Sequence, residues 1–257
     1  MLTAQNLEVD FSGKVILKGV SFKLEKEKAL LLGPNGSGKT TLLRTILGLY
    51  PYRGSLKVDG QEVKSLKSHV GVATNLPPVY SLALTIKDLA YILEEIIGLD
   101  PKLFHSLLRE MALEDVFTQP LYTLSSGQSV LVRNAFAVSS KPHILLLDEP
   151  FENVDPRKRL ALVNWFKNGA EEAVLVTHDL SIAKKFEGWK VFFISEGLIY
   201  GPVMLEEFLE ASIVEEERDG ALMTVIVGGK KLSIIKSSSE GIKLDSIDSL
   251  NRLYEVV

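Results

Sequence analysis

The chain has 257 residues, a length that suits one large domain or one domain with a small appendage. Its formal charge of -4 argues against sequence-independent binding of nucleic acid, so we expect no nucleic-acid partner. The absence of cysteine excludes disulfides, thiol chemistry and cysteine-bound metals. No apolar run approaches the ~20 residues of a membrane span, and the N-terminus lacks a signal-peptide pattern, so we expect a soluble intracellular protein.

The N-terminal part predicts strands joined by short turns and one helix. Alternating or continuously apolar residues predict strands over 7–11, 20–24, 29–32, 55–58, 61–63 and 70–73, and a helix is expected over 40–49. Asp59-Gly60, between two of these strands, is a strong hairpin signal. The hairpins indicate that this part of the chain forms an antiparallel β-subdomain.

Residues 76–140 predict an inserted helical subdomain, with helices over 89–97 and 101–111. Strands and helices then alternate, in the order strand 144–147, helix 155–168, strand 173–176, helix 180–186 and strand 191–194. Such alternation predicts an α/β fold with a mainly parallel sheet that helices cover on both faces. An acidic turn and a hairpin around Gly228-Gly229 follow, so we expect a main domain over 1–205 and a small α+β extension over 206–257.

Residues 33–40 spell G-P-N-G-S-G-K-T, the phosphate-loop pattern, between a predicted buried strand and a predicted helix. The glycines allow successive backbone N–H groups to curl around phosphate oxygens, and the helix N-terminus adds donors. Lys39 can reach the β- and γ-phosphates as a point charge, and the Thr40 hydroxyl can ligate Mg²⁺. The chain is therefore predicted to contain a P-loop NTPase core that binds a nucleotide.

Two carboxylates, Asp148 and Glu149, directly follow the predicted buried strand 144–147. Ligands of open α/β sheets bind at the carboxyl ends of the strands, where the phosphate loop also lies. We predict that Asp148 holds Mg²⁺, directly or through water. Glu149 is predicted to polarise the water that attacks the γ-phosphate, as a general base.

Further motifs resemble one family, the ABC ATPases, which are the nucleotide-binding subunits of ABC transporters. Leu124-Ser125-Ser126-Gly127-Gln128 is similar to the family signature LSGGQ, Asn153-Val154-Asp155 to its D-loop, and Val176-Thr177-His178-Asp179 to its switch histidine. Phe11 lies where the family stacks an aromatic ring on adenine. The resemblance covers about residues 1–205, with the motifs in the order that the family requires.

The resemblance implies a head-to-tail dimer of ATPase subunits, homo- or heterodimeric, with two ATP molecules between them. It implies ATP contacts from Phe11, Gly33, Pro34, Asn35, Gly36, Ser37, Gly38, Lys39, Thr40 and Thr41 of one subunit and from Ser125, Ser126, Gly127, Gln128 and Asp155 of the other. It also implies catalytic roles for Lys39, Glu149 and His178, and Mg²⁺ contacts for Thr40, Asp148 and Asn75.

Two positions depart from the family pattern. Asn75 stands where the family has the Q-loop glutamine, and its shorter stem predicts a looser or water-bridged contact with the metal. On that interpretation, Asn75→Gln should raise partner-stimulated turnover; the alternative is that Asn75 has lost the role. Ser126 replaces the central glycine of the signature, which brings a side chain into a tight place. Both changes bear on turnover and coupling, whereas the intact catalytic set predicts a competent ATPase.

The resemblance implies a subunit that powers an ABC transporter through separate membrane subunits and sits peripherally at the cytoplasmic face of the cell membrane. The apolar loop 75–84 lies where the family receives a short helix of the membrane subunit. Two alternatives stay open: a soluble ABC ATPase outside transport, and a nucleotide-binding regulatory module with little turnover. The sequence does not name the cargo, because its contacts lie on other chains.

Overall fold

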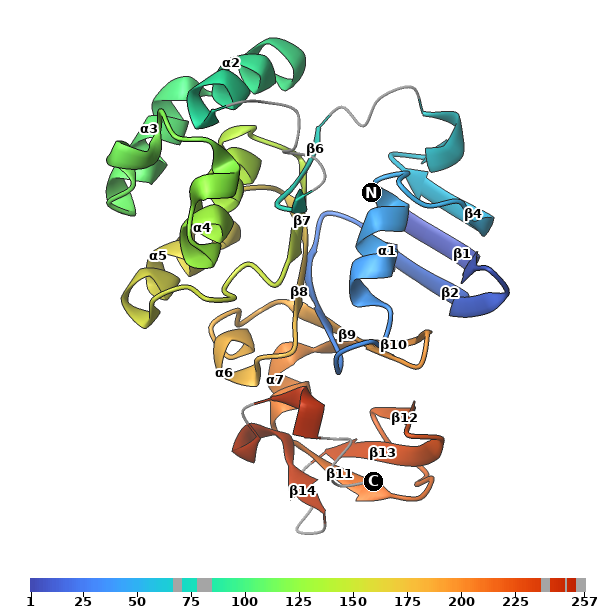
Figure 1. The fold of residues 1–257 in the computed structure, drawn as a ribbon. Helices are drawn as coiled ribbons and strands as arrows, with labels where there is room; N and C mark the ends of the chain where they lie inside the picture. Colours follow the sequence, from blue (N-terminus) through green and yellow to red (C-terminus); the bar gives the residue numbers. More distant parts are fainter. Residues whose placement is uncertain (67–70, 78–84, 237–240, 248, 253–257) are drawn as a thin grey trace. The chain divides into compact units, whose positions relative to one another are not determined.

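The computed structural model describes residues 1–66, 71–77, 85–236, 241–247 and 249–252. It consists of two compact units, shown in Figure 1. The first unit combines Met1–Lys67 with Val176–Val257, and the second is Ser68–Leu175. Among the described residues, no helix is long and apolar enough to cross a membrane.

An antiparallel sheet opens the first unit, in the strand order β2-β1-β4-β5, which confirms the predicted N-terminal subdomain. Its strands are β1 (Leu2–Phe11), β2 (Lys14–Leu24), β4 (Arg53–Val58) and β5 (Gln61–Glu62), and a 3₁₀ turn, η1 (Val63–Ser65), follows β5. Strand β1 begins at Leu2, earlier than predicted from the sequence. Its register with β2 shifts between Ala4 and Leu7, around Asn6, which has a φ of 47°. The shift breaks the alternation of buried residues, so the sequence pattern hid the first half of the strand.

The phosphate loop lies between a buried strand and a helix of the same unit. Strand β3 (Lys28–Leu32) pairs in parallel with β9 (Lys190–Ser195), which pairs antiparallel with β10 (Leu198–Met204). The apolar residues of β3 are almost fully buried, as expected for an inner strand. Helix α1 (Lys39–Ile46) follows the loop and lies beside β2 (Figure 1). It ends before residue 49, the predicted end, because Gly48 turns the chain with a φ of 70°.

The chain returns to the first unit along β8 (Glu172–Thr177), which α6 (Leu180–Ala183) follows. The C-terminal residues form α7 (Leu205–Leu209) and an antiparallel sheet in the order β12-β13-β11-β14. Its strands are β11 (Ala211–Glu215), β12 (Met223–Val227), β13 (Lys230–Lys236) and β14 (Ile242–Lys243), and two 3₁₀ turns follow, η5 (Leu244–Ser246) and η6 (Leu250–Arg252). The hairpin predicted around Gly228-Gly229 is the β12–β13 pair.

The second unit contains two parallel strands, β6 (Val72–Thr74) and β7 (Ile144–Asp148), with its helices gathered to one side of them in Figure 1. The helices are α2 (Ile86–Ile97), α3 (Pro101–Glu110), α4 (Ser126–Ser139) and α5 (Pro156–Asn168), with 3₁₀ turns at η3 (Glu114–Val116) and η4 (Leu121–Thr123). Side chains of Thr85, Asp100, Ser125 and Asp155 cap the four α-helices, which fixes where each begins. The rings of Phe104 and Phe136, stacked 4.3 Å apart, pack α3 against α4.

Candidate functional site

The phosphate loop of the first unit contains glycines whose backbone conformation would strain any other residue. Gly36 and Gly38 have φ angles of 78° and 110°, in the left-handed region. A Cβ atom on Gly38 would lie 2.9 Å from Leu17 Cδ2. Gly38 is also the N-cap of α1 and offers no capping side chain, and the N-terminus of a helix attracts anions.

Lys39 lies across this loop rather than pointing away from it. Its Nζ donates hydrogen bonds to the carbonyl oxygens of Gly33 at 2.8 Å and Pro34 at 2.9 Å, and the residue is only 6% exposed. Ser37 is also buried, and its Oγ has no hydrogen-bond partner within the described residues. A buried ammonium and a buried hydroxyl beside uncapped N–H groups fit an anion such as phosphate. Thr40 and Thr41, also predicted to bind, lie in the first turn of α1.

Phe11, predicted to stack on adenine, ends β1 and is 39% exposed. Its ring meets the ring of Tyr50 edge-on, with centroids 4.8 Å apart. Arg44 donates a 2.7 Å hydrogen bond to the Tyr50 hydroxyl, which holds this aromatic pair at the end of α1. The adenine contact stays a prediction, and Tyr50 is an aromatic neighbour that the sequence motifs did not indicate.

The loop that carries His178 contacts the C-terminal residues of the same unit. The Leu250 N–H donates to the His178 carbonyl oxygen at 3.0 Å, and Ser249 forms a strand-like bridge with Asp179. The next residue, Asn251, accepts a 2.8 Å hydrogen bond through Oδ1 from the backbone N–H of Asn35 in the phosphate loop. Sequence reasoning missed this contact, because no motif relates residues that are 216 positions apart.

In the second unit, β7 delivers the two predicted carboxylates at its end. Its residues Ile144–Leu147 are fully buried, and Asp148 is the last residue of the strand. Glu149 follows with a φ of 40°, a left-handed conformation that costs a non-glycine residue about 1–2 kcal/mol. Residues held in this way are common at functional sites, where the surrounding structure fixes them.

Asn75 directs its side chain at the backbone of Asp148. The Asp148 N–H donates to Asn75 Oδ1 at 2.8 Å, and Asn75 Nδ2 donates to the Asp148 carbonyl oxygen at 3.2 Å and to Asn134 Oδ1 at 2.9 Å. The residue is 1% exposed. The amide is therefore engaged within the protein. The looser or water-bridged metal contact predicted for Asn75 stays a prediction.

The signature residues begin helix α4 of the second unit. Ser125 is the N-cap and forms a capping box with Gln128, with hydrogen bonds of 3.3 and 3.1 Å. Ser126, the first helical residue, is exposed in the single chain, and the tight place expected for its side chain stays a prediction. A Cβ atom on Gly127, in contrast, would lie 2.3 Å from the carbonyl oxygen of Asn153. The structure thus brings the signature and the predicted D-loop together.

Two predicted contacts remain predictions at this point. Asp155 accepts an N–H bond from Arg157 at 2.8 Å and caps α5, and its place in a dimer is not tested by a single chain. Residues 78–84 of the apolar loop predicted to receive a membrane subunit lie outside the described residues.

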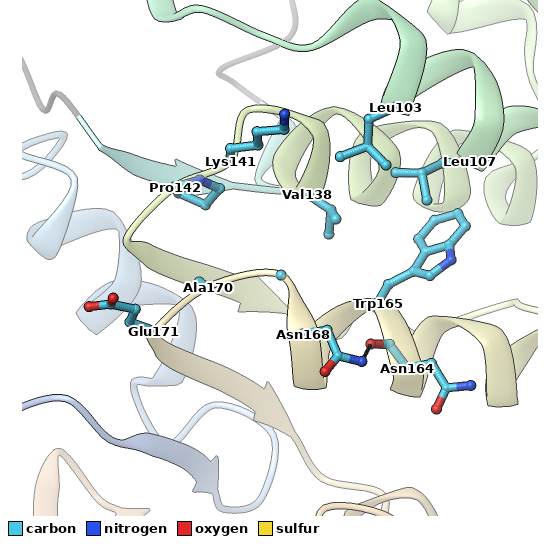
Figure 2. Close-up of a pocket in the computed structure, with 11 residues that line it drawn as sticks. Leu103, Leu107, Val138, Lys141, Pro142, Asn164, Trp165, Asn168, Ala170 and Glu171 are labelled. Atoms are coloured by element: carbon cyan, nitrogen blue, oxygen red, sulfur yellow. Dashed lines mark hydrogen bonds between the residues drawn. The ribbon is translucent and has the colours of Figure 1, made fainter.

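The second unit also contains a cavity of about 690 Å³ between α3, α4 and α5. Figure 2 shows Leu103, Leu107 and Trp165 around it, and the Asn168 side chain bonded to the backbone of Asn164. None of its lining residues belongs to the predicted nucleotide motifs. The candidate functional residues of each unit are therefore the loop and motif residues above, and this cavity is not among them.

Comparisons with known proteins identify the family. The family model described as ABC transporter matches residues 17–152, just over half of the chain. The taurine import ATP-binding protein TauB of Escherichia coli O157:H7 is 31% identical over 213 residues, which cover 79% of this chain and 80% of that protein. The TauB protein of Escherichia coli strain K12 is 32% identical over 194 residues, which cover 71% of this chain and 75% of that protein.

Solved structures extend the likeness to the whole chain. A candidate cobalt transport ATP-binding protein, cbiO-2, is 40% identical and matches with a TM-score of 0.93 over 100% of both chains. A dimeric structure of the ATP-binding cassette MJ0796 bound to ADP and Pi is 22% identical, with a TM-score of 0.68 over 80% of this chain and 99% of that chain, and shows the shared fold alone. These matches confirm the predicted α/β P-loop NTPase fold. The chain belongs to the ABC transporter family, as one of its ATP-binding, ATP-hydrolysing subunits.

Proposed function

We propose that this chain uses ATP bound at its phosphate loop to power transport through separate membrane subunits. The observation that carries the proposal is the position of Lys39, whose buried ammonium lies across the loop within 2.9 Å of two carbonyl oxygens. An ammonium held at the carbonyl oxygens of the loop can also reach the oxygens of a phosphate bound there, and a charge-assisted hydrogen bond to phosphate is a strong one. A nucleotide phosphate in the loop would therefore meet both the charge of Lys39 and the N-terminus of α1.

Each motif then has a role in hydrolysis. The N–H groups of the loop and of the first turn of α1 bind the phosphates, and Lys39 balances their charge. Glu149 accepts the proton of the water that adds to the γ-phosphorus, while His178 contacts the γ-phosphate and orients that water. The bond to the β–γ bridging oxygen breaks, which leaves ADP in the loop and releases phosphate.

Mg²⁺ is the expected companion of the nucleotide. Among the described residues, no cluster of three or more His, Cys, Asp or Glu side chains could hold a metal alone. The hydroxyl of Thr40 and the carboxylate of Asp148 are hard oxygen donors, which suit a cation that shares its coordination with phosphate. Bound there, Mg²⁺ supplies positive charge that offsets the phosphates. We propose that Asn75 acts on Asp148 through the backbone instead of binding the cation.

A second ATPase subunit, identical or homologous, is the proposed partner of the signature residues. Ser125–Gln128 form the N-terminus of α4, an arrangement of N–H groups that attracts anions, and they would cover the γ-phosphate held by the other subunit. Asp155 would cross the same interface. The wider partners are membrane subunits, which would hold the protein at the cytoplasmic face of the membrane.

The proposed cargo is inferred from a relative whose likeness extends over the whole chain. The curated taurine importers cover 71% and 79% of this chain, whereas the candidate cobalt transport protein covers all of it, the C-terminal residues included. This coverage favours a cobalt-type system over taurine import. Co-purification of the membrane subunits, followed by uptake of labelled cobalt or taurine into vesicles, decides between the two.

Replacement of Lys39 tests the nucleotide site. Lys39→Ala should abolish ATP hydrolysis and weaken ATP binding at least tenfold, because it removes the buried charge from the loop. Lys57→Ala, which changes an exposed lysine on β4 of the same unit, is the matched control and should behave as the wild type. Unchanged binding and hydrolysis in Lys39→Ala would contradict the proposal.

A nucleotide-binding module with little turnover is the second candidate. The observation that favours it is the engagement of the Asn75 amide within the protein, which withdraws the group that the family uses at the metal and water. Under this alternative the wild-type chain binds ATP through Lys39 but fails to hydrolyse it, even in a single turnover.

A further inference from the structure

Asn134 is a buried polar residue in the middle of α4, and no motif accounts for it. It is 0% exposed, and Leu131, Val132, Ala135 and Phe136 of the same helix are buried apolar residues of the core. Both ends of its amide are used: Oδ1 accepts from Asn75 Nδ2 at 2.9 Å, and Nδ2 donates to the Pro150 carbonyl oxygen at 2.8 Å. A buried amide in a helix is costly unless its bonds are made, so these two contacts hold it in one orientation.

The two asparagines together bind both residues that flank Glu149. Asn75 bonds the N–H and the carbonyl oxygen of Asp148, and Asn134 bonds the carbonyl oxygen of Pro150. The donors and acceptors fix the amide orientations, because only Oδ1 can accept from an N–H and only Nδ2 can donate to a carbonyl. Between these anchored residues, Glu149 has a φ of 40°. The pair is thus a clamp on a backbone segment that is otherwise unfavourable for a non-glycine residue.

Helix α4 supplies a second bond to the same clamp. Arg133 Nη1 donates to the Asn75 carbonyl oxygen at 2.6 Å, and Arg133 Nε donates to Ser129 within the helix. Asn75 is therefore fixed through its backbone by Arg133 and through its side chain by Asn134. The helix that supplies both residues begins at the signature, at Ser126. Any displacement of α4 would move the clamp and the segment that carries Glu149 together.

We propose that Asn134 is a positioning residue for ATP hydrolysis: paired with Asn75, it fixes the backbone on either side of Glu149 and so orients the proposed general base. The proposal rests on the proposed function, since it concerns the same catalytic carboxylate. It also explains the asparagine at position 75. A glutamine carries its amide one methylene farther out and would displace either Asp148 or Asn134, so Asn75→Gln should lower turnover, the reverse of the expectation from the sequence.

The test separates turnover from binding. In single-turnover hydrolysis, Asn134→Ala should lower the rate about 10- to 100-fold, the scale expected when a reacting group is misplaced by about 1 Å. ATP affinity should change less than about twofold, because Asn134 is not proposed to touch the nucleotide. Asn168→Ala, which removes an exposed amide that donates to the Asn164 carbonyl oxygen within α5, is the matched control. Asn134→Ser, with a smaller polar group, serves if the alanine variant does not fold.

The decisive measurement is the effect of Asn134→Ala on hydrolysis in the Glu149→Gln variant, which lacks the proposed general base. If Asn134 acts through Glu149, Asn134→Ala should change the residual rate of Glu149→Gln by less than about twofold, because the group it orients is already lost. An equal loss in both backgrounds, or an unchanged rate in Asn134→Ala, would overturn the proposal.

Hydrogen exchange across residues 148–154 tests the clamp without hydrolysis, and this segment should exchange faster in Asn134→Ala than in the wild type. Unchanged exchange would overturn the clamp. A wild-type chain that neither binds nor hydrolyses ATP would instead refute the proposed function, so the two failures are distinguishable.

Discussion

Replacing Gly127 of the signature with alanine sets two effects on stability against each other, a gain in helix propensity and a steric overlap with the D-loop. Alanine favours a helix over glycine by about 0.8–1.0 kcal/mol, so helix propensity alone predicts that this change in α4 stabilises the protein. The structure predicts the reverse. The new Cβ would lie 2.3 Å from the carbonyl oxygen of Asn153, whereas real Cβ contacts are essentially never under 3.0 Å. The D-loop backbone or the start of α4 must therefore move by roughly 0.7 Å or more.

Overpacking of this kind typically costs 1–3 kcal/mol, which offsets the gain in helix propensity. We expect Gly127→Ala to lower the free energy of unfolding by about 1 kcal/mol net and to slow ATP hydrolysis. Equilibrium urea unfolding, followed by circular dichroism, measures the first effect, and a phosphate-release assay measures the second. Ser126→Ala, at the exposed neighbouring position, is the control and should stay within about 0.5 kcal/mol of the wild type. A Gly127→Ala variant as stable as the wild type, or more stable, would refute the tight contact with Asn153.

Two further predictions concern the first unit. Asn251→Ala removes the amide oxygen that occupies the Asn35 N–H, so ATP affinity measured by titration of a fluorescent analogue should rise about two- to tenfold; weaker binding would show that Asn251 supports the loop instead. Burial raises the pKa of Glu62, but hydrogen bonds from Leu56, Ser55 and Tyr52 outweigh this effect and leave it below the usual value of 4.5. Glu62→Gln should therefore lower stability by about 1.5 kcal/mol at neutral pH, and the difference from the wild type should shrink as the pH falls below 4.5 towards the lowered folded-state pKa. A difference that is constant from pH 7 to pH 3 would contradict the assignment of a charged carboxylate.

The parts of the site that the sequence could predict are those encoded by neighbouring residues. The phosphate loop, the end of β7 and the signature each lie within a few consecutive positions, and their spacing carries the chemistry. The capping residues Ser125 and Asp155 are local in the same sense, since each bonds N–H groups two or three residues ahead. Such features need no knowledge of the tertiary fold.

The contacts that the sequence could not predict join residues far apart in the chain. The Asn75 amide bonds Asn134, 59 positions away, and Asp148, 73 positions away. The sequence alone therefore could not show that the short side chain of Asn75 fits the backbone of Asp148. The contact of Asn251 with the phosphate loop has no local signal at all. The first half of β1 was missed for a different reason, the register shift that breaks its alternation.

The measurement that tests the central claim most directly is ATP hydrolysis beside size-exclusion chromatography, with and without ATP, for the wild type and Glu149→Gln. We predict that the wild type hydrolyses ATP, whereas Glu149→Gln binds ATP without turnover and elutes as a dimer only when ATP is present. A Glu149→Gln variant that hydrolyses ATP at the wild-type rate would contradict the role of Glu149 as general base. A variant that stays monomeric with ATP bound would contradict ATP-driven closure of two copies of this chain.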